Sequence, residues 1–547
     1  MKKSFLLLLC MFLAIVADAQ VLKKVSIKSA SASSENTTSE NAAKAIDGKY
    51  DTFWHSVWSG GQTSFPVTFT ITMSEEVHLD VVRYVPRQGN INGNWGNVEV
   101  LYRNSETGSK YVSLGTYNLN NSSDSHDFEI GMPVKYVRFS IKNGQGGWAT
   151  ASEIEAYQFD NTKLEAFKPY FEDDLFTTLK PEVTSSESIE DADVKALVDN
   201  LLNDQEYKNF RVGEFEPYEN PYTLQSELKI KAPYCLWENP SGIYLKSGES
   251  CYVMLSGAGS DAVKLTIKNW VNNENETTYS LRNGLNKITA GSEGNVFVNY
   301  YTDNYKNAPN VKLHFINAPV RGYWDQQTMT NADWTKMLRK LENDNSIIIV
   351  RSEHAQLAYP VSAWKQYCPT NVDSLMTLYQ QVQWAVRDIL GLNKYGRQKK
   401  NRQLYYATTY GFMAAGGHGA YCNVNSLNAI MTPDSKKFDF WGVGHEWGHN
   451  NQVNGFHWSG CGETTNNITA SWAQLHFTGN RSYLRLEDEN SGIDEYSSMR
   501  GGRMQTYFEE GLRKGVQWQL QDGPDYHGAT PDTKTVTGYD YNGNSIG

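Results

Sequence analysis

The chain has 547 residues, and its 50 Lys and Arg against 61 Asp and Glu give a formal net charge of −11. This balance argues against a protein that binds nucleic acid by neutralising phosphates. With 39% hydrophobic and 20% charged residues, the composition is that of a folded protein. At roughly 100–200 residues per domain, the length predicts about three domains.

The first residues have the pattern of an export signal. An apolar run from Phe5 to Val16 follows two lysines, and Ala17 and Ala19 supply the small residues of a cleavage site, so residues 1–19 are predicted to be removed. The run has about 12 residues, whereas a transmembrane helix needs about 20. We therefore expect a secreted, cell-surface or periplasmic protein without a transmembrane segment.

Export removes Cys10, and the remaining cysteines are too few and too widely spaced to form a disulfide scaffold. None of them belongs to a paired CxxC metal-binding pattern. We expect packed thiols, and a bridge between Cys235 and Cys251 stays open. The remaining cysteines are Cys235, Cys251, Cys368, Cys422 and Cys461.

Hydrophobic patterning divides the mature chain into four parts. Residues 25–160 alternate short β-rich runs with Gly, Asn and Ser turns, which predicts an all-β sandwich. Residues 161–209 are predicted to be a linker with one amphipathic helix, and residues 210–325 a second β-sandwich. Residues 326–547 change to an α+β pattern, with helices predicted at "NADWTKMLRKLEND", "NVDSLMTLYQQVQWAVRDILGL", "SWAQLHFTG" and "MQTYFEEGLRKGVQWQLQ".

The last residues, "YDYNGNSIG", form a turn-like segment with no closing element. We expect the catalytic unit to continue beyond Gly547, which a longer reading frame would establish.

The chemistry is indicated by His445-Glu446-Trp447-Gly448-His449, an H-E-x-x-H motif. On a helix the two histidines share one face and can bind one Zn²⁺. Glu446 is placed to reach the water on that metal, take its proton during attack on a carbonyl, and pass it to the leaving amine. The motif predicts a metal-dependent peptidase.

The third zinc ligand is predicted to be Glu463, which opens the next helix and completes a His₂Glu set with one position open to water. His457 is the alternative, from a loop. A metzincin site is disfavoured because Gly455 stands where its third histidine would lie. Asn466 and Asn467, one turn after Glu463, are candidates for orienting a ligand.

Two further features of the active site are predicted only in outline. The Gly-rich segment at residues 411–421 is a candidate edge strand for an extended substrate, with an ordinary turn as the alternative. Tyr507 and His418 are candidates for stabilising the oxyanion.

With Glu463 following His449 after thirteen residues, and with "HEWGHNNQ" and "GETTNNI" around them, the sequence resembles the enhancin-like, mucin-degrading zinc metallopeptidases of the gluzincin group. The resemblance covers roughly residues 215–547. It implies a zincin-like catalytic domain, with zinc bound by His445, His449 and Glu463, Glu446 as the catalytic residue, and O-glycosylated proteins such as mucins as substrates.

Three blocks near the N-terminus, "AAKAIDGKYDTFWHSVW", "YVPRQGNINGNW" and "GGWATASEIEAY", resemble a discoidin-like, coagulation-factor type C carbohydrate-binding module. The resemblance implies a jelly-roll sandwich that binds glycans containing galactose or N-acetylgalactosamine. The matching residues are His55, Arg87 and Asn92 for the hydroxyl groups and Trp148 for the apolar face of the sugar. The alternative for His55 and Arg87 is a structural or merely exposed side chain.

The same resemblance implies a structural Ca²⁺ in this module, held by oxygen atoms of Asp47, Thr52 and Glu153.

The sequence therefore predicts an exported zinc endopeptidase that a sugar-binding module directs to mucin-type O-glycoproteins. One alternative is a non-enzymatic glycan-binding adhesin with a structural zinc. The other is a glycoside hydrolase, for which no pair of facing carboxylates can be chosen.

Overall fold

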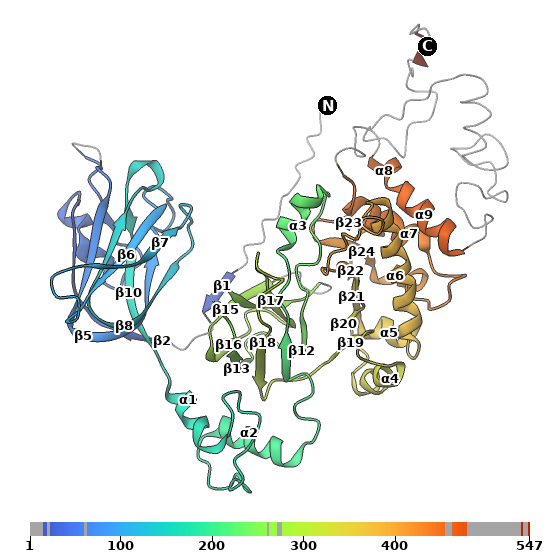
Figure 1. Cartoon of the computed structure of the whole chain (residues 1–547), viewed down its shortest axis with the longest axis horizontal. Helices are drawn as coiled ribbons and strands as arrows, with labels where there is room; N and C mark the ends of the chain where they lie inside the picture. The colour runs from blue at the N-terminus through green and yellow to red at the C-terminus, as the bar shows by residue number, and fades with distance from the viewer. Residues whose placement is uncertain are drawn as a thin grey trace. The chain divides into compact units, whose positions relative to one another are not determined.

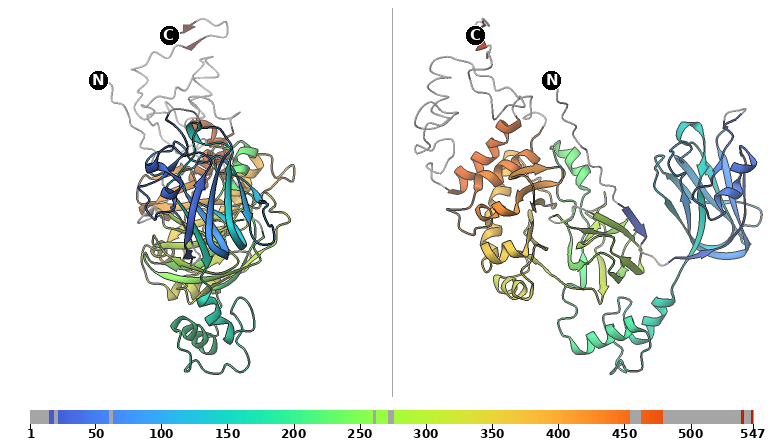
Figure 2. Two further views of the ribbon diagram at one scale, coloured as in Figure 1. Left: turned by 90° about the vertical axis from the view of Figure 1, so that its left-hand side faces the viewer. Right: turned by 180° about the vertical axis from the view of Figure 1, so that it is seen from behind.

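The chain forms two units, Gln20–Glu165 and the residues outside that range. The structure, a computed structural model shown in Figures 1 and 2, describes residues 15–18, 22–59, 63–259, 262–270, 276–453 and 462–478, together with two short strands. These strands are β25 (Gly538–Tyr539) and β26 (Ser545–Ile546).

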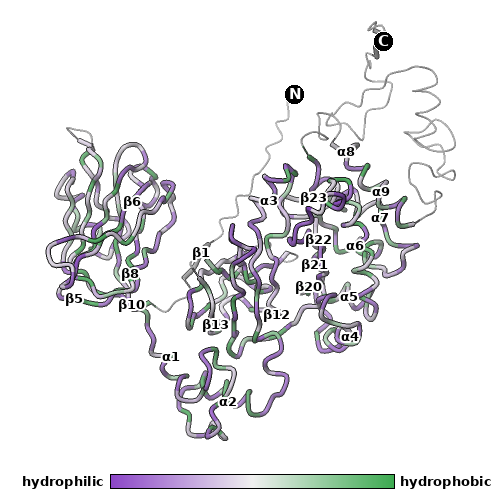
Figure 3. Tube along the Cα trace, in the orientation of Figure 1, coloured by the Kyte–Doolittle hydropathy of each residue, from purple (hydrophilic) through white to green (hydrophobic). Residues whose placement is uncertain are grey.

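The unit Gln20–Glu165 is an all-β sandwich built on one seven-stranded sheet in the order β2-β10-β5-β8-β6-β7, with β3 paired to β5. Hydrophobic and hydrophilic residues alternate along these strands (Figure 3), and the hydrophobic ones form a single core. The longest strand is Val67–Val85, whose pairing with the strand His126–Ile141 has an irregular register between Thr72 and Val77. The strands are β2 (Leu22–Val25), β3 (Ile27–Ala32), β4 (Trp54–His55), β5 (Val67–Val85), β6 (Asn97–Arg103), β7 (Val112–Asn118), β8 (His126–Ile141), β9 (Thr150–Ala151) and β10 (Glu153–Phe159).

The linker contains α1 (Thr162–Phe167) and α2 (Ala192–Asn203). The N-terminus of α2 is capped by Asp191, whose carboxylate accepts hydrogen bonds from two backbone N–H groups of the first turn. Helix α3 (Pro221–Leu228) follows. The predicted amphipathic helix is therefore present.

The second β-sandwich packs two sheets, in the orders β1-β15-β14-β17-β12 and β11-β18-β13-β16, around its own core. Its strands are β1 (Ile15–Asp18), β11 (Val212–Phe215), β12 (Pro240–Leu245), β13 (Ser250–Ser256), β14 (Val263–Lys268), β15 (Glu276–Leu281), β16 (Gly284–Thr289), β17 (Gly294–Tyr300) and β18 (Val311–Ile316). Strand β1 lies within the predicted signal peptide and pairs with β15. The predicted cleavage site after Ala19 lies outside the described residues.

The catalytic part contains a six-stranded mixed sheet in the order β19-β20-β21-β22-β24-β23. In Figures 1 and 2 the helices of this part lie on one side of the sheet and the second β-sandwich on the other. The strands are β19 (Tyr323–Asp325), β20 (Ile347–Arg351), β21 (Ala355–Pro360), β22 (Gln403–Thr408), β23 (Met413–Gly416) and β24 (Gly419–Asn423). The helices are α4 (Asn331–Lys340), α5 (Val361–Tyr367), α6 (Val372–Ile389), α7 (Phe440–Asn450), α8 (Gly462–Thr465) and α9 (Asn467–Thr478).

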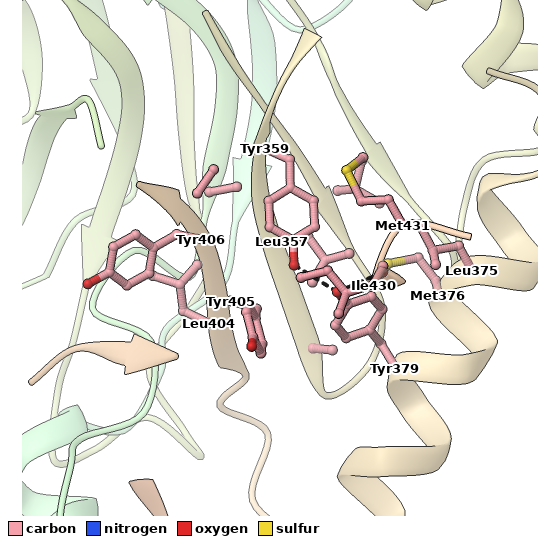
Figure 4. Close-up of a cluster of buried hydrophobic side chains, with 14 of the residues drawn as sticks. Leu357, Tyr359, Leu375, Met376, Tyr379, Leu404, Tyr405, Tyr406, Ile430 and Met431 are labelled. Carbon is pink, nitrogen blue, oxygen red and sulfur yellow. Dashed lines mark hydrogen bonds between the residues drawn. The ribbon is translucent and has the colours of Figure 1, made fainter. Parts of the chain in front are cut away.

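Aromatic side chains fill the space between this sheet and its helices. The hydroxyl groups of Tyr359 and Tyr379 lie 2.7 Å apart, and that of Tyr379 donates to the carbonyl of Ile430 (Figure 4). In the same view Tyr405 and Tyr406 project from opposite faces of β22. The sheet therefore presents aromatic side chains to both of its neighbouring layers.

Most of the predicted architecture is confirmed: an N-terminal sandwich precedes a mainly β region and a mixed α and β catalytic part. The bridge considered between Cys235 and Cys251 is not formed, because both residues are buried free thiols on separate clusters. The helix predicted at "MQTYFEEGLRKGVQWQLQ" lies outside the described residues. Among the helices that the structure describes, none has the length and apolar character needed to cross a membrane.

A buried histidine couples the linker to the second sandwich. The ring of His314 on β18 donates from Nδ1 to the carbonyl of Leu175 (2.7 Å), while Nε2 accepts from the hydroxyl of Tyr207 (3.1 Å). Burial lowers the pKa of His314 to about 4. Burial and these two hydrogen bonds, one donated and one accepted by the ring, keep the imidazole neutral.

Because the unfolded chain takes up a proton near pH 6.5 and the folded chain only near pH 4, the stability supplied by neutral His314 is lost as the pH falls through this range. We predict that His314→Phe reduces the fall in unfolding free energy between pH 7 and pH 5 by about 2 kcal/mol. Urea unfolding at both pH values measures the difference. An identical fall in the two proteins would contradict this role.

Candidate functional site

Helix α7 carries both histidines of the H-E-x-x-H motif on one face. The carboxylate of Asp439 caps the helix by accepting a hydrogen bond from the backbone N–H of Gly442 (2.8 Å). The rings of His445 and His449 lie one turn apart, with centroids separated by 4.8 Å and perpendicular planes. The helix therefore brings the two imidazoles together.

Glu463 joins the two histidines from α8. Its Oε2 lies 3.2 Å from Nε2 of His445 and 3.0 Å from Nε2 of His449. Ligand atoms about 2.0–2.1 Å from a tetrahedral zinc ion are roughly 3.3 Å apart, so the spacing and the donor set both fit zinc. Within the described residues, this is the one group of three or more His, Cys, Asp or Glu side chains arranged to hold a metal ion.

The two histidines favour the ionised form of Glu463, and Glu463 favours the protonated form of His445. Hydrogen bonds from His445 and His449 lower the pKa of the Glu463 carboxyl. Burial acts to lower the pKa of His445, but its hydrogen bonds to Glu463 and Asn467 outweigh burial and raise it. A divalent cation would replace the protons that join these groups.

Glu446 lies beside the ligands and is not one of them. Glu446 is 7% exposed. Burial raises the pKa of its carboxyl, and this effect outweighs the nearby His445 and His449, which lower it. A carboxylate with a raised pKa is suited to accept and return a proton near neutral pH.

Two glycines let α9 approach α7 closely enough for this geometry. A Cβ on Gly444 would lie 3.0 Å from Cα of Ala470, and a Cβ on Gly448 only 2.7 Å from the carbonyl oxygen of Asn466. Any larger residue in place of Gly448 would push α9 away from α7. The glycines of the motif region therefore set the distance between the histidines and the residues that face them.

Asn466 and Asn467, the two asparagines after Glu463, form hydrogen bonds with His445 and Glu463, as the sequence suggested. The Oδ1 of Asn467 accepts a hydrogen bond from Nδ1 of His445 (2.7 Å), and its Nδ2 donates to the backbone carbonyl of Glu463 (2.8 Å). Asn466 donates to the backbone carbonyl of His445 (3.2 Å). Asn467 thus orients one histidine while fixing the start of the helix that carries the carboxylate.

Three consecutive amides after His449, which the sequence analysis did not single out, connect α7 to three different elements. Asn450 donates to the carbonyl of Gly416 at the end of β23 (3.1 Å). Asn451 exchanges two amide hydrogen bonds with Gln403 on β22, of 2.7 and 2.9 Å. All three amides are buried, and the third is Gln452.

Gln452 connects His449 to α8, the helix that carries Glu463. Its Nε2 donates to the carbonyl of Gly462 (2.5 Å) and to the hydroxyl of Thr465 (3.0 Å). Its Oε1 lies 3.4 Å from Nδ1 of His449. The run "HNNQ" is visible in the sequence, but its partners lie on separate elements and become neighbours only in the fold.

The glycine-rich segment forms β23 and β24, and β23 is the edge strand beside α7. The predicted edge strand is therefore present. Of the oxyanion candidates, His418 lies in the turn between these strands, with its ring centroid 6.0 Å from that of Trp237. Tyr507 and the alternative ligand His457 lie outside the described residues.

The four predicted sugar-binding residues gather in the N-terminal sandwich. The rings of His55 and Trp148 have centroids 6.3 Å apart. Both Trp148 and Asn92 lie against Gly146, where a Cβ would be 2.7 Å from the indole and 3.3 Å from the Asn92 Oδ1. The Arg87 guanidinium stacks on the ring of Phe53, 4.1 Å from its centroid, and that ring lies 6.4 Å from the ring of His55.

A second indole beside His55 was missed by the sequence analysis. Trp58 is 50% exposed, and its ring centroid lies 6.2 Å from that of His55. Its Nε1 donates to the carboxylate of Glu40 (2.9 Å), which also accepts from Asn36. In the sequence, the signal for this second indole was Trp58 itself, which stands three residues after His55.

The three residues predicted for calcium are close together. The hydroxyl of Thr52 lies 2.8 Å from Oδ1 of Asp47 and also contacts the carbonyl of Lys49. Glu153 is buried and accepts hydrogen bonds from the backbone N–H groups of Gly48 and Lys49. Burial raises the pKa of Glu153 to about 7, a shift that a bound cation would oppose.

Residues 322–527 match the family of peptidase M60, enhancin and enhancin-like proteins, and residues 29–154 match the F5/8 type C domain. The structure is similar to a metallopeptidase from Bacteroides thetaiotaomicron, with 19% identity and a TM-score of 0.53 over 64% of each chain. It is also similar to the two CBM32 modules and M60 catalytic domain of Clostridium perfringens ZmpB, with 17% identity, a TM-score of 0.47, and coverage of 90% of this chain and 58% of that one.

Among curated proteins, galactose oxidase of Gibberella zeae is 32% identical over 154 residues. This match covers 27% of this chain and 22% of the relative, so the chain spans less than a quarter of that protein's length. The comparisons confirm both of the domain types that the sequence predicted.

We predict that Gln452→Leu weakens zinc binding about 10- to 100-fold. The substitution removes the hydrogen bonds of the Gln452 amide to His449, Gly462 and Thr465, and so releases both His449 and the helix of Glu463. Competition with a chromogenic chelator measures the zinc affinity. Gln452→Glu keeps an acceptor for His449 but cannot donate to Gly462, so it separates the two roles.

The matched control is Gln398→Leu, which removes an exposed amide outside this group. Equal zinc affinity in Gln452→Leu and Gln398→Leu would exclude the positioning role.

Proposed function

We propose that this protein is an exported zinc endopeptidase that cleaves mucin-type O-glycoproteins, because residues 322–527 match the enhancin-like M60 peptidases and residues 29–154 match the F5/8 type C domains. The observation that carries the proposal is the convergence of His445, His449 and Glu463 beside the buried carboxyl of Glu446.

His445, His449 and Glu463 would hold the zinc ion, leaving one position for water or substrate. When bound, zinc supplies Lewis-acid polarisation and lowers the pKa of a coordinated water. Glu446 then accepts the proton of the attacking water and returns it to the nitrogen of the leaving amine. Its burial favours both steps because the neutral and ionised carboxyl become closer in free energy near neutral pH.

Strand β23 would bind the polypeptide. Its outer edge pairs with no other described strand, so an extended substrate can continue the sheet by backbone hydrogen bonds. Such binding holds the scissile bond beside the helix of Glu446 without requiring a particular side chain.

The N-terminal sandwich would direct the enzyme to its substrate by binding galactose or N-acetylgalactosamine. His55, Arg87 and Asn92 supply polar groups, and the indole of Trp148 covers the apolar face of the ring. A weak sugar site joined to the catalytic part raises its effective concentration on glycan-rich surfaces. Removal of residues 1–19 as a signal peptide would place it there.

The alternative of an adhesin with a structural zinc has less support. Structural zinc sites have four protein ligands, whereas three potential ligands converge in the described part of the chain. An adhesin also has no need for a buried carboxyl next to the metal.

We predict that Glu446→Gln retains zinc but lowers the rate of mucin cleavage by about 10²- to 10⁴-fold, because it removes the proton acceptor. Cleavage of mucin and of deglycosylated mucin is measured with and without a chelator, with the exposed Glu342→Gln as control. Undiminished turnover would exclude Glu446 from the mechanism. Chelator-insensitive binding to mucin without backbone scission would favour the adhesin.

Asp47, Thr52 and Glu153 are proposed to bind a structural Ca²⁺. Calcium should then raise the melting temperature of the N-terminal sandwich, because it binds the folded state alone. Asp47→Asn should reduce this increase, whereas the exposed Asp51→Asn should not. Differential scanning calorimetry of the full chain, with calcium or with chelator, measures the effect. A melting temperature that is independent of calcium would rule out the site.

A further inference from the structure

A buried arginine in the last turn of α6 carries a charge that its neighbours do not balance. Arg387 is 1% exposed, and its Nε and Nη1 atoms have no hydrogen-bond partner among the residues that the structure describes. Its Nη2 makes one long hydrogen bond, to the carbonyl of Asn401 (3.4 Å). An arginine side chain keeps its proton in proteins, and a buried charge is costly without a partner. This guanidinium therefore needs a negatively charged acceptor.

The carboxylates around Arg387 are engaged elsewhere or exposed. Burial lowers the pKa of its guanidinium, against the opposing effects of Glu353 and Glu238. Glu238 is buried and forms an ion pair with Arg402 (3.2 Å). Glu353 is exposed, and its carboxylate lies 3.6 Å from Nε2 of His354. These carboxylates leave the charge of Arg387 without a buried partner.

A neighbouring histidine reports the same excess of positive charge. Burial and the charges of Arg387 and Arg402 lower the pKa of His354 to about 3. The backbone N–H of His354 donates to Oε1 of Gln380 (3.2 Å), so this residue lies against α6, the helix of Arg387. His354 is therefore neutral near pH 7, and the positive potential at this end of α6 comes from the two arginines.

A second buried donor lies beside the same turn of α6. Tyr234 is 1% exposed, and its hydroxyl makes no hydrogen bond with a described residue. Tyr234 packs in a small hydrophobic cluster with Leu390, one turn after Arg387. Burial raises the pKa of Tyr234, and the charge of Arg387 acts to lower it, so the two groups are electrostatic neighbours. The backbone N–H of Ala232 holds this segment to the carbonyl of Asn450, at the end of α7 (3.0 Å).

We propose that a chloride ion binds in the core of the catalytic part, between the guanidinium of Arg387 and the hydroxyl of Tyr234. Both groups can donate hydrogen bonds to an anion, and a hydrogen bond from a charged donor is a strong one. A single negative charge balances the single guanidinium. Because both side chains are almost completely buried, the occupant must be small, which excludes a sulfate, a phosphate or the carboxylate of a peptide.

The proposed anion site adjoins the elements that support the zinc ligands. Gln383, one turn before Arg387 on α6, donates to Oε1 of Gln403 on β22 (3.0 Å). Gln403 exchanges amide hydrogen bonds of 2.7 and 2.9 Å with Asn451, two residues after His449. An ion that neutralises Arg387 thus stabilises the layer behind α7 without touching the metal. This role is separate from the proposed peptidase chemistry.

The first test is thermal unfolding of the full-length, zinc-loaded protein at constant ionic strength, with sodium gluconate replaced stepwise by sodium chloride. Gluconate is too large for an enclosed site and serves as the inert anion. The melting temperature should rise with chloride and then level off, because the ion binds the folded state. Arg387→Met should abolish this dependence. The variant keeps a long side chain and removes an unpaired buried charge, so it should remain folded.

Tyr234→Phe is a milder variant that keeps the ring in place. It should weaken chloride binding about tenfold, because it removes one hydrogen bond to a charged group. The matched control is Arg397→Met, which removes an exposed arginine in the loop after α6 and should leave the chloride dependence unchanged.

The second test locates the ion directly. Crystals of the full-length protein are soaked in sodium bromide, and anomalous scattering is measured at the bromine absorption edge. A peak beside Arg387, absent in Arg387→Met, is the expected result. The proposal is overturned if chloride and gluconate give the same melting temperatures, if the chloride dependence persists in Arg387→Met, or if a water molecule occupies the site and no bromide peak appears. A bromide peak without any effect on stability would show an adventitious ion only and would also overturn it. Neither test involves peptide cleavage, so failure of the peptidase proposal remains a separate result.

Discussion

Close backbone contact between α7 and α9 is the constraint on which the candidate active site depends. A Cβ on Gly448 would lie 2.7 Å from the carbonyl oxygen of Asn466, so the helices can meet here because this position has no side chain. The contact brings Glu463 to the two histidines and Asn467 to Nδ1 of His445. The donor set follows from helix packing, which holds the side chains more firmly than loops would.

The opposite side of α7 is fixed to the sheet. The indole of Trp447 donates to the carbonyl of Leu404 (3.2 Å), and its ring packs on Tyr379 and Tyr405. The amides that follow the helix add connections to β22, to β23 and to α8. The helix is thus held by the core, by β23 and by α8. This explains why the sequence around the motif is rich in Gly, Asn and aromatic residues.

The sequence predicted the parts of the site that depend on local spacing. His445 and His449 share a face because a helix repeats every 3.6 residues, and Glu463 follows within a short distance along the chain. The partners of Gln452 could not be predicted, because they lie on a separate element that only the fold brings beside it. In the N-terminal sandwich, Trp58 was missed because its position beside His55 is visible only in the fold.

The account depends most directly on the identity and geometry of the metal. Anomalous scattering measured at the zinc absorption edge, from crystals of the full-length protein, tests both. The predicted result is one zinc peak bound by His445, His449 and Glu463, with its remaining position open to solvent. A site that binds no zinc when zinc is supplied, or a zinc ion enclosed by a fourth protein ligand, would contradict the account.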